Sequence, residues 1–203
     1  MNTDKLRETY NEIAEGYLRY PHQNWDNDFI RYFAKALKPG SRILDLGCGP
    51  GIESKIFAEL DFDVYGFDLS DHFIELARKQ VANGHFTQGD MRNLLYEDEY
   101  FDGIFCKASL LHIPKNEIDV VLKEITRVLR KNGLLHVALK KGDDEGDITD
   151  DRYGETITRF FSFWKEDKFR DKLLSFPYEL IKEDAYLRPG SKTTWLKFLF
   201  RKV

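Results

Sequence analysis

The sequence lacks the cysteines that a disulfide framework or a zinc site requires. It has only two, Cys48 and Cys106, and they lie far apart in the chain. Neither an extracellular disulfide pattern nor the paired spacing of metal ligands can be built from them. We therefore expect a reduced, cytoplasmic protein without a bound metal.

Long apolar runs are also absent. The first residues, MNTDKLRETY, contain no apolar stretch of the kind that a secretory signal carries. No segment approaches the length of a membrane span. The sequence thus predicts no membrane association.

Charge of one sign is not in excess. The chain has 31 Lys and Arg against 35 Asp and Glu, a net charge of −4 at pH 7. Nucleic acids attract proteins mainly through clustered positive charge, so we do not expect a nucleic-acid partner. With 203 residues, of which 42% are hydrophobic, the chain has the length of one globular domain. Nothing in the sequence indicates the oligomeric state.

What the sequence does have is a regular alternation of strand and helix patterns between residues 41 and 139. Short apolar runs, typical of buried strands, alternate with segments whose apolar residues lie three and four positions apart. This alternation predicts an α/β fold, a parallel sheet with helices on both faces. Ser70 is a predicted N-cap. The predicted strands are 42–46, 64–67, 85–88, 101–106 and 134–139, and the predicted helices are 52–60, 71–82 and 117–129.

The two flanks of this region have a different pattern. Apolar periodicity predicts helices in the N-terminal flank, and turn residues separate the segments in the C-terminal flank. The last two strands form a predicted antiparallel hairpin. The predicted segments are helices over 3–19 and 26–37, an acidic loop over 141–158, a helix over 165–174, and strands over 178–187 and 193–200 around a turn at 188–191.

A glycine-rich stretch, ILDLGCGPG (43–51), follows the first predicted strand. A dinucleotide-binding loop has its third glycine three residues after the second, but position 52 is Ile52. No Gly-Lys-Ser/Thr follows, which excludes a phosphate-binding P-loop as well. Asp45, at the end of the strand, does not suit a pyrophosphate and suits a ligand that carries positive charge.

Two further acids follow the neighbouring strands. Asp68 closes the second strand in VYGFDLS, where its carboxylate can accept hydrogen bonds from two ribose hydroxyls. Asp90 follows the third strand in FTQGDM, placed to meet an adenine amino group, with Met91 beside it as an apolar contact. A ribose, an adenine and a cationic group together describe S-adenosylmethionine.

In this order and spacing, the motifs resemble those of the class I S-adenosylmethionine-dependent methyltransferases. The resemblance extends over residues 5–140 and includes FDGIFCKASLLHIP and VLKEITRVLRKNGLLHVALK. It implies a Rossmann-like seven-stranded, mostly parallel sheet of order 3-2-1-4-5-7-6, with strand 7 antiparallel. YNEIAEGY also resembles the Tyr-x-x-x-Ala-x-x-Tyr segment of small-molecule members such as the ubiquinone/menaquinone-biosynthesis type. In those proteins an N-terminal helix folds over the cofactor.

The resemblance implies one methyltransferase domain that spans residues 1–203. Its expected parts are an N-terminal helical lid (1–38), a cofactor-binding core (39–140), a variable substrate region (141–176) and a C-terminal hairpin (177–203).

The cofactor implied by the resemblance is S-adenosylmethionine, with S-adenosylhomocysteine as the product and no metal. Cys48 is expected to contribute its backbone. Cys106 is preceded by Phe105 and not by the proline of cytosine-5 methyltransferases, which favours a packing or cofactor-side contact over a nucleophile. The predicted cofactor contacts are Tyr10, Tyr17, Asp45, Gly47, Cys48, Gly49, Gly51, Asp68, Leu69, Asp90, Met91 and Cys106.

His112, at the mouth of the fourth strand, is the first candidate for a general base, and Tyr17 is the second. A structural histidine bonded to nearby backbone is an alternative of at least equal weight. Arg159, Phe161 and Trp164 predict either ordinary core packing or a substrate wall in which Arg159 pairs with an anion. The six acids between residues 143 and 151 predict a solvated loop, with guidance of a cationic substrate as the alternative.

The predicted function is in-line transfer of a methyl group from S-adenosylmethionine to a small-molecule acceptor. The alternatives are an RNA- or protein-modifying methyltransferase, a noncatalytic module that binds the cofactor and, less favoured, a nicotinamide dehydrogenase. The Asn/Asp-Pro-Pro-Tyr/Phe element of amino methyltransferases is missing after the fourth strand, where the chain has CKAS. The sequence does not identify the acceptor or the atom that is methylated.

Overall fold

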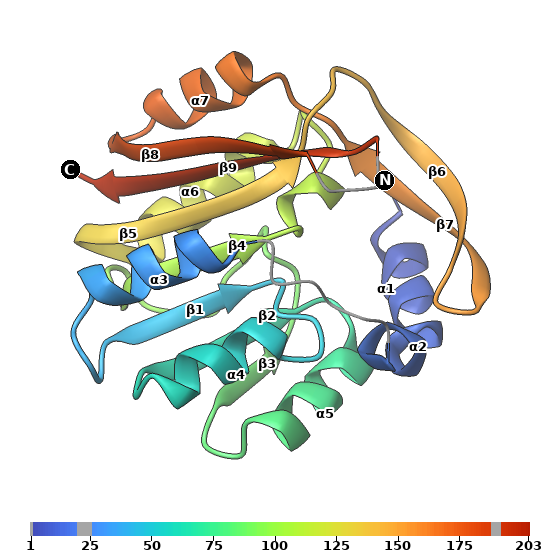
Figure 1. Cartoon of the computed structure of the whole chain (residues 1–203). Helices are drawn as coiled ribbons and strands as arrows, with labels where there is room; N and C mark the ends of the chain where they lie inside the picture. Colours follow the sequence, from blue (N-terminus) through green and yellow to red (C-terminus); the bar gives the residue numbers. More distant parts are fainter. Residues whose placement is uncertain (1, 20–25, 188–191) are drawn as a thin grey trace.

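The computed structural model describes residues 2–19, 26–187 and 192–203. A seven-stranded sheet of order β3-β2-β1-β4-β5-β9-β8 runs through the molecule, with helices on both faces (Figure 1). β9 is antiparallel to both of its neighbours, β5 and β8. The predicted fold class, strand order and antiparallel strand are confirmed. The sheet strands are Arg42–Leu46 (β1), Asp63–Asp68 (β2), His85–Gln88 (β3), Phe101–Lys107 (β4), Leu129–Lys140 (β5), Tyr178–Leu187 (β8) and Thr194–Lys202 (β9).

The predicted helices of the core are present with small shifts at their ends. Ser70 caps α5, because its hydroxyl accepts a hydrogen bond of 3.0 Å from the amide of Phe73. The predicted final hairpin is also confirmed, although the turn at 188–191 lies outside the described residues. The helices that cover the sheet are Asn27–Ala36 (α3), Ile52–Glu59 (α4), Asp71–Gln80 (α5), Ile118–Val128 (α6) and Glu166–Leu174 (α7), and a short 3₁₀ turn lies at Leu110–His112.

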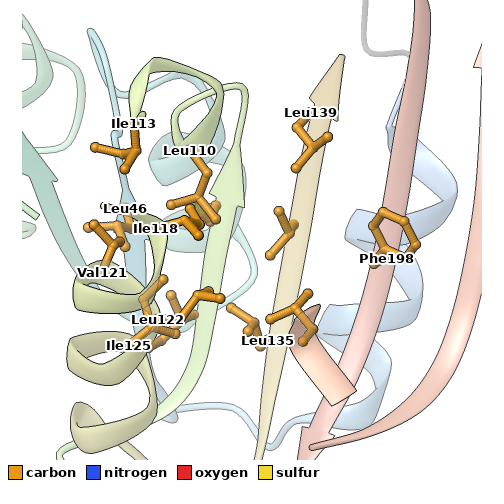
Figure 2. Close-up of a cluster of buried hydrophobic side chains, with 14 of the residues drawn as sticks. Leu46, Leu110, Ile113, Ile118, Val121, Leu122, Ile125, Leu135, Leu139 and Phe198 are labelled. Atoms are coloured by element: carbon orange, nitrogen blue, oxygen red, sulfur yellow. The ribbon is translucent and has the colours of Figure 1, made fainter. Parts of the chain in front are cut away.

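Two apolar layers hold the helices on the sheet. On one face, Phe33 of α3, Phe57 of α4 and Phe105 of β4 are fully buried and meet in edge-to-face and tilted ring contacts. On the other face, Leu122 and Ile125 of α6 pack toward the central strands (Figure 2). Each fully buried side chain of this size contributes about 1.5–3 kcal/mol to folding.

One ion pair is completely buried between α3 and the sheet. Nε2 of His136 lies 2.7 Å from Oδ2 of Asp26, and neither side chain is exposed. Nδ1 of His136 lies 3.0 Å from the carbonyl of Phe198. Burial alone would raise the pKa of Asp26, but the charge and hydrogen bond of His136 lower it overall. The pair fixes the start of α3 against the sheet.

The predicted single helix over residues 3–19 is wrong. The structure has two helices, Thr3–Glu12 (α1) and Ala14–Arg19 (α2), with a break at Ile13, which is 1% exposed. A Cβ atom at Gly16 would lie 2.4 Å from the carbonyl oxygen of Tyr153. The break therefore turns α2 so that its glycine lies directly against a later segment of the chain.

The predicted loop over residues 141–158 is also wrong. The chain there forms an antiparallel hairpin of Glu145–Arg152 (β6) and Glu155–Ser162 (β7). The turn residues Tyr153 and Gly154 have positive φ of 60° and 90°, as a two-residue type I′ turn requires. The acidic side chains of β6 are mostly exposed, whereas Ile157, Arg159 and Phe161 on β7 are buried. Because the exposed side chains of β6 are mostly acidic, its sequence led to the prediction of a loop.

The hairpin lies beside α1 and α2, at the edge of the sheet where the parallel strands end (Figure 1). Of the predicted N-terminal lid, α1 and α2 are the helices at this edge, while α3 packs on the sheet. Within the described residues, no helix is long and apolar enough to span a membrane. The same residues contain no group of three or more His, Cys, Asp or Glu side chains arranged to hold a metal ion.

Candidate active site

A cavity of about 100 Å³ lies where β1, β2 and β4 end, under α1 and α2. The strand order reverses between β1 and β4, and open α/β sheets bind ligands at this switch point. The cavity joins parts of the chain that are far apart in the sequence. Its lining residues are Thr3, Leu6, Tyr10, Tyr17, Gly47, Gly49, Phe67, Asp68, Leu69, Phe73, Gly89, Asp90, Met91, Arg92, Lys107, Ala108, Ser109, His112 and Ile113.

The glycine-rich loop approaches the cavity with its backbone. The amides of Gly47 and Cys48 both donate to the carbonyl of Phe67, at 2.7 and 3.2 Å. Gly47 has φ +78°, and a Cβ atom there would lie 2.2 Å from Cβ of Ser109. Gly49 has φ +52°, and nothing lies within 4 Å of the place of its missing Cβ. The loop thus needs glycine for two reasons, close packing at Gly47 and open space for a ligand at Gly49.

Asp68 lies at the centre of the cavity wall. Its carboxylate accepts hydrogen bonds from the amides of Gly49 (2.8 Å) and Ser70 (2.9 Å), one to each oxygen. Burial raises the pKa of Asp68 to about 6, and the backbone hydrogen bonds oppose that rise. Each carboxylate oxygen has more than one acceptor position, so Asp68 can also accept hydrogen bonds from ligand hydroxyls.

Four of the predicted cofactor contacts lie behind the cavity wall and do not line it: Asp45, Cys48, Gly51 and Cys106. Asp45 is 2% exposed and accepts a hydrogen bond of 2.6 Å from the hydroxyl of Ser54. Burial, with Glu53 nearby, raises the pKa of Asp45 to about 7. Cys106 is fully buried, with Sγ 3.0 Å from the hydroxyl of Ser109. These four residues support the glycine-rich loop from behind, and so they influence the shape and the charge of the cavity.

Asp90 and Met91 line the cavity, but the carboxylate of Asp90 is already engaged by Arg92. Nε of Arg92 lies 2.9 and 3.0 Å from the two oxygens of Asp90. Burial alone would raise the pKa of Asp90, and the hydrogen bonds from Arg92 lower it overall. Arg92 also donates to Glu117 and to the hydroxyl of Thr3 on α1.

Arg92 therefore connects three elements around the cavity, and sequence reasoning missed it. An arginine two positions after an acidic turn residue is a common surface pattern. Only the fold brings Thr3 and Glu117 within its reach.

Tyr10 and His112 meet at the roof of the cavity. Oη of Tyr10 lies 2.6 Å from Nε2 of His112, and Nδ1 of the same ring lies 2.6 Å from the carbonyl oxygen of Phe160. A carbonyl only accepts, so Nδ1 carries the hydrogen and Nε2 accepts from Tyr10. Burial lowers the pKa of His112 to about 3 and raises that of Tyr10 to about 12, so both groups are neutral at neutral pH.

This geometry favours the structural alternative for His112. Its Nε2 faces the cavity side but is already bonded to Tyr10, and its low pKa makes it a weak base. Tyr17, the second candidate base, also lines the cavity, and burial raises its pKa well above the ordinary value. Its ring packs against Phe73 and Tyr153, at centroid distances of 5.1 and 4.9 Å.

The three predicted substrate residues separate in the structure. Phe161 lies next to His112, with ring centroids 4.8 Å apart. Arg159 lies 5.2 Å from the Phe161 ring, on the same face of β7. Trp164 instead packs on Phe169 of α7, 5.3 Å between centroids, and does not line the cavity. Trp164 therefore belongs to the core, where its apolar ring supports α7.

Comparison with known proteins agrees with this geometry. A family model described as a methyltransferase domain matches residues 43–133. The ubiquinone biosynthesis O-methyltransferase of Pelagibacter ubique (strain HTCC1062) is 34% identical over 126 residues, which are 60% of this chain and 51% of that protein. Over this region the chain is similar to S-adenosylmethionine-dependent methyltransferases. The chain spans about half the length of the curated relatives it matches.

Two solved structures share the methyltransferase fold. A SAM-dependent methyltransferase of Methanosarcina mazei has a TM-score of 0.74 at 21% identity, over 86% of this chain and 97% of that one. The 1,6-didemethyltoxoflavin-N1-methyltransferase of Burkholderia thailandensis, solved with 1,6-didemethyltoxoflavin and S-adenosylhomocysteine bound, has a TM-score of 0.68 at 19% identity, over 97% and 90%. Both likenesses support the fold.

The residues present fit the cofactor of this family. The open space beside Gly49 gives a ligand access to the loop backbone, and the Asp68 carboxylate offers acceptors for hydroxyls. Leu69 and Met91 supply apolar surface for a flat base. Asp45 and Asp68 are buried carboxyl groups whose pKa values are raised, and a cationic group bound nearby favours their charged forms.

Proposed function

We propose that this chain transfers a methyl group from S-adenosylmethionine to a small-molecule acceptor. The observation that carries the proposal is the Gly49–Asp68 contact, which places a carboxylate with free acceptors beside an open stretch of backbone at the switch point of the sheet. The names of the relatives support the small-molecule class, since one acts in ubiquinone biosynthesis and another binds 1,6-didemethyltoxoflavin.

When bound, S-adenosylmethionine supplies an electrophilic methyl group on a sulfonium. The residues of this chain hold and enclose it. Asp68 binds the ribose hydroxyls, and the Gly47–Gly49 backbone bounds the amino-acid end. Leu6, Tyr10 and Tyr17 close the cavity from above and exclude water. Fixing the acceptor in line with the methyl group can account for about 7–11 kcal/mol of the barrier.

Among the residues that the structure describes, none at the roof of the cavity is a strong base. His112 is neutral with a pKa of about 3, and Tyr10 donates its only hydroxyl hydrogen to it. The oxygen of Tyr10 can still accept a hydrogen bond from an N–H or O–H group of the acceptor other than the atom that is methylated, and so orient the acceptor. The mechanism proposed here is therefore catalysis by positioning, with an acceptor that is deprotonated before transfer.

Calorimetric titration with S-adenosylmethionine and S-adenosylhomocysteine tests this function. We expect micromolar binding by the wild type and a loss of at least about tenfold in Asp68→Asn, because hydrogen bonds to a charged acceptor contribute roughly 1.5–3 kcal/mol. Asp63→Asn is the matched control, since Asp63 lies at the opposite end of the same strand. Absence of binding by the wild type contradicts the proposal. Binding without methyl transfer to any compound of a broad acceptor panel favours the noncatalytic module.

A further inference from the structure

Two cationic side chains lie close to the Phe161 ring. Nζ of Lys140, at the end of β5, is 3.9 Å from the ring centroid, and Cζ of Arg159 is 5.2 Å from it. The centroid of the Tyr153 ring is 5.8 Å from Cζ of Arg159. The cations are thus held among aromatic rings, where cation–π contacts favour them but do not neutralise their charge.

Of these two cations, only Arg159 is paired with a carboxylate in the described residues. Nη2 of Arg159 donates to both oxygens of Asp150, at 2.9 and 3.0 Å, while its Nε is buried without a hydrogen-bond partner in the described residues. Arg159 as a whole is only 4% exposed. Over 2–19, 26–187 and 192–203, Lys140 has no ion pair with a carboxylate. Its neighbour Lys141, by contrast, lies 3.4 Å from Glu166.

A charge that is buried in a protein without a partner of opposite sign is unfavourable, and this is expressed in the pKa of Lys140. Burial, reinforced by the nearby charge of Arg159, lowers the pKa of Lys140 to about 8. Proteins seldom keep a partly buried cation without a partner unless a ligand supplies the anion. Lys140 and Arg159, beside Phe161, therefore carry an excess of positive charge, as in an anion-binding site whose anion is supplied by a ligand.

This group adjoins the cavity of the proposed active site. The Phe161 ring packs on His112, which accepts the hydrogen bond of Tyr10, and both His112 and Tyr10 line the cavity. The positive charges of Arg159 and Lys140 both help to lower the pKa of His112, so both cations lie near its ring. A molecule that met the cofactor beneath Tyr10 could thus extend toward Phe161.

From these contacts we infer that the methyl acceptor is a small aromatic carboxylic acid, whose carboxylate is bound by Lys140 and Arg159 while its ring packs against Phe161. This inference rests on the proposed function for the identity of the acceptor. The anion site itself does not depend on methyl transfer. Lys140 and Arg159 act here as specificity-determining residues, and the acceptor's carboxylate provides the negative charge that the chain lacks.

Matched acid and amide probes test the inference. Benzoate, salicylate and cinnamate are compared with benzamide, salicylamide and cinnamamide by calorimetry, with and without saturating S-adenosylhomocysteine. The variant Lys140→Met keeps the length of the side chain over Phe161 and removes the charge. Lys141→Met is the control, because it removes one positive charge from the next residue, whose side chain is 48% exposed.

We expect at least one acid to bind about tenfold or more tightly than its amide, the strength of a hydrogen bond to a charged group. We also expect that preference to disappear in Lys140→Met and to persist in Lys141→Met. Equal binding of acids and amides, no binding of any acid, or a preference that Lys140→Met retains would each overturn the inference. Acid preference in a protein that does not bind S-adenosylhomocysteine would support the anion site and contradict the proposed methyl transfer.

Discussion

Tyr10 of α1 and His112, 102 positions apart in the chain, are joined by a hydrogen bond of 2.6 Å over the cavity. The carbonyl of Phe160 on β7 binds the other nitrogen of the same ring. One imidazole thus connects the N-terminal helix, the turn after β4 and the hairpin. His112 closes the roof of the cavity by joining three segments, and its protonation state determines whether it can do so.

The protonation state of His112 can be measured directly. Nitrogen-15 NMR of the imidazole is expected to show one protonated nitrogen and one unprotonated nitrogen, unchanged between pH 8 and pH 5, because the pKa of His112 is lowered to about 3. Free histidine in the same sample titrates near pH 6.5 and serves as the internal reference. A transition of His112 near that value would restore it as a candidate general base.

Substitution of Tyr10 tests the same contact from the other side. Tyr10→Phe leaves the ring in place but removes the hydrogen bond to His112, and we expect a loss of about 0.5–1.5 kcal/mol in the free energy of unfolding. Affinity for S-adenosylhomocysteine should fall as well, because α1 is less firmly held over the cavity. Tyr32→Phe, on the exposed part of α3, is the control for loss of a tyrosine hydroxyl. Equal stability of the two variants would argue against a structural role of the Tyr10 bond.

Gly47 and Gly40 form a matched pair for the backbone of the loop. Their φ angles are +78° and +79°, but a Cβ atom meets Ser109 at 2.2 Å in the first case and nothing within 4 Å in the second. We expect Gly40→Ala to lower the free energy of unfolding by about 1–2 kcal/mol through backbone strain. Gly47→Ala should lower it further, and denaturant unfolding measures both. Similar losses would mean that Ser109 moves aside and that close packing does not require this glycine.

Arg92 is predicted to hold α1 against the core. Arg92→Met removes the contacts to Thr3, Asp90 and Glu117 together, and we expect faster proteolysis of the N-terminal segment and weaker binding of S-adenosylhomocysteine. Arg127→Met is the control, since Arg127 binds Glu124 and Asp98 and does not line the cavity. If both variants release the N-terminal segment equally, the effect is one of general stability and Arg92 is not a specific tie.

The buried carboxyl groups behind the loop predict how stability depends on pH. The pKa is raised to about 7 for Asp45 and to about 6 for Asp68, whereas an unfolded aspartate has a pKa near 3.9. Between about pH 4 and pH 7 the folded state therefore binds more protons than the unfolded state, and the ligand-free protein should lose stability as pH rises through this range. For these two groups alone the expected change is on the order of 5 kcal/mol, at about 1.4 kcal/mol for each pKa unit. His112, whose pKa is lowered to about 3, has the opposite sign below about pH 6.5 and offsets part of this change.

Urea unfolding of the wild type and of Asp45→Asn at pH 5 and pH 8 measures this dependence. The variant should be less sensitive to pH than the wild type. Asp26→Asn has the opposite sign, because the pKa of Asp26 is lowered: the contribution of this carboxylate is present above about pH 4 and is lost as the pH falls below it. An increase in wild-type stability from pH 5 to pH 8 would contradict the raised pKa values of Asp45 and Asp68.

The sequence by itself determined the fold class and the residues at the strand ends, whereas the strand order was implied by the resemblance to a known family. Strands such as Arg42–Leu46 are buried on both faces of a parallel sheet, so they can be recognised as short apolar runs in the sequence. Asp68 and the Gly47–Gly51 loop lie directly at a strand end, and the topology alone brings them to one edge. Eight of the twelve predicted cofactor contacts line the cavity, and six of them do so for this reason: Gly47, Gly49, Asp68, Leu69, Asp90 and Met91.

Only the tertiary structure decided what each polar side chain touches. Sequence reasoning placed Asp90 near the cavity but could not show that Arg92 already binds it, and it took the acidic β6 strand for a loop. The protonation of His112 depends on Tyr10 and Phe160, and the charge at Lys140 depends on Arg159 and Phe161. These contacts join residues that are distant in the chain, so burial and electrostatics at the site arise only when the segments pack together.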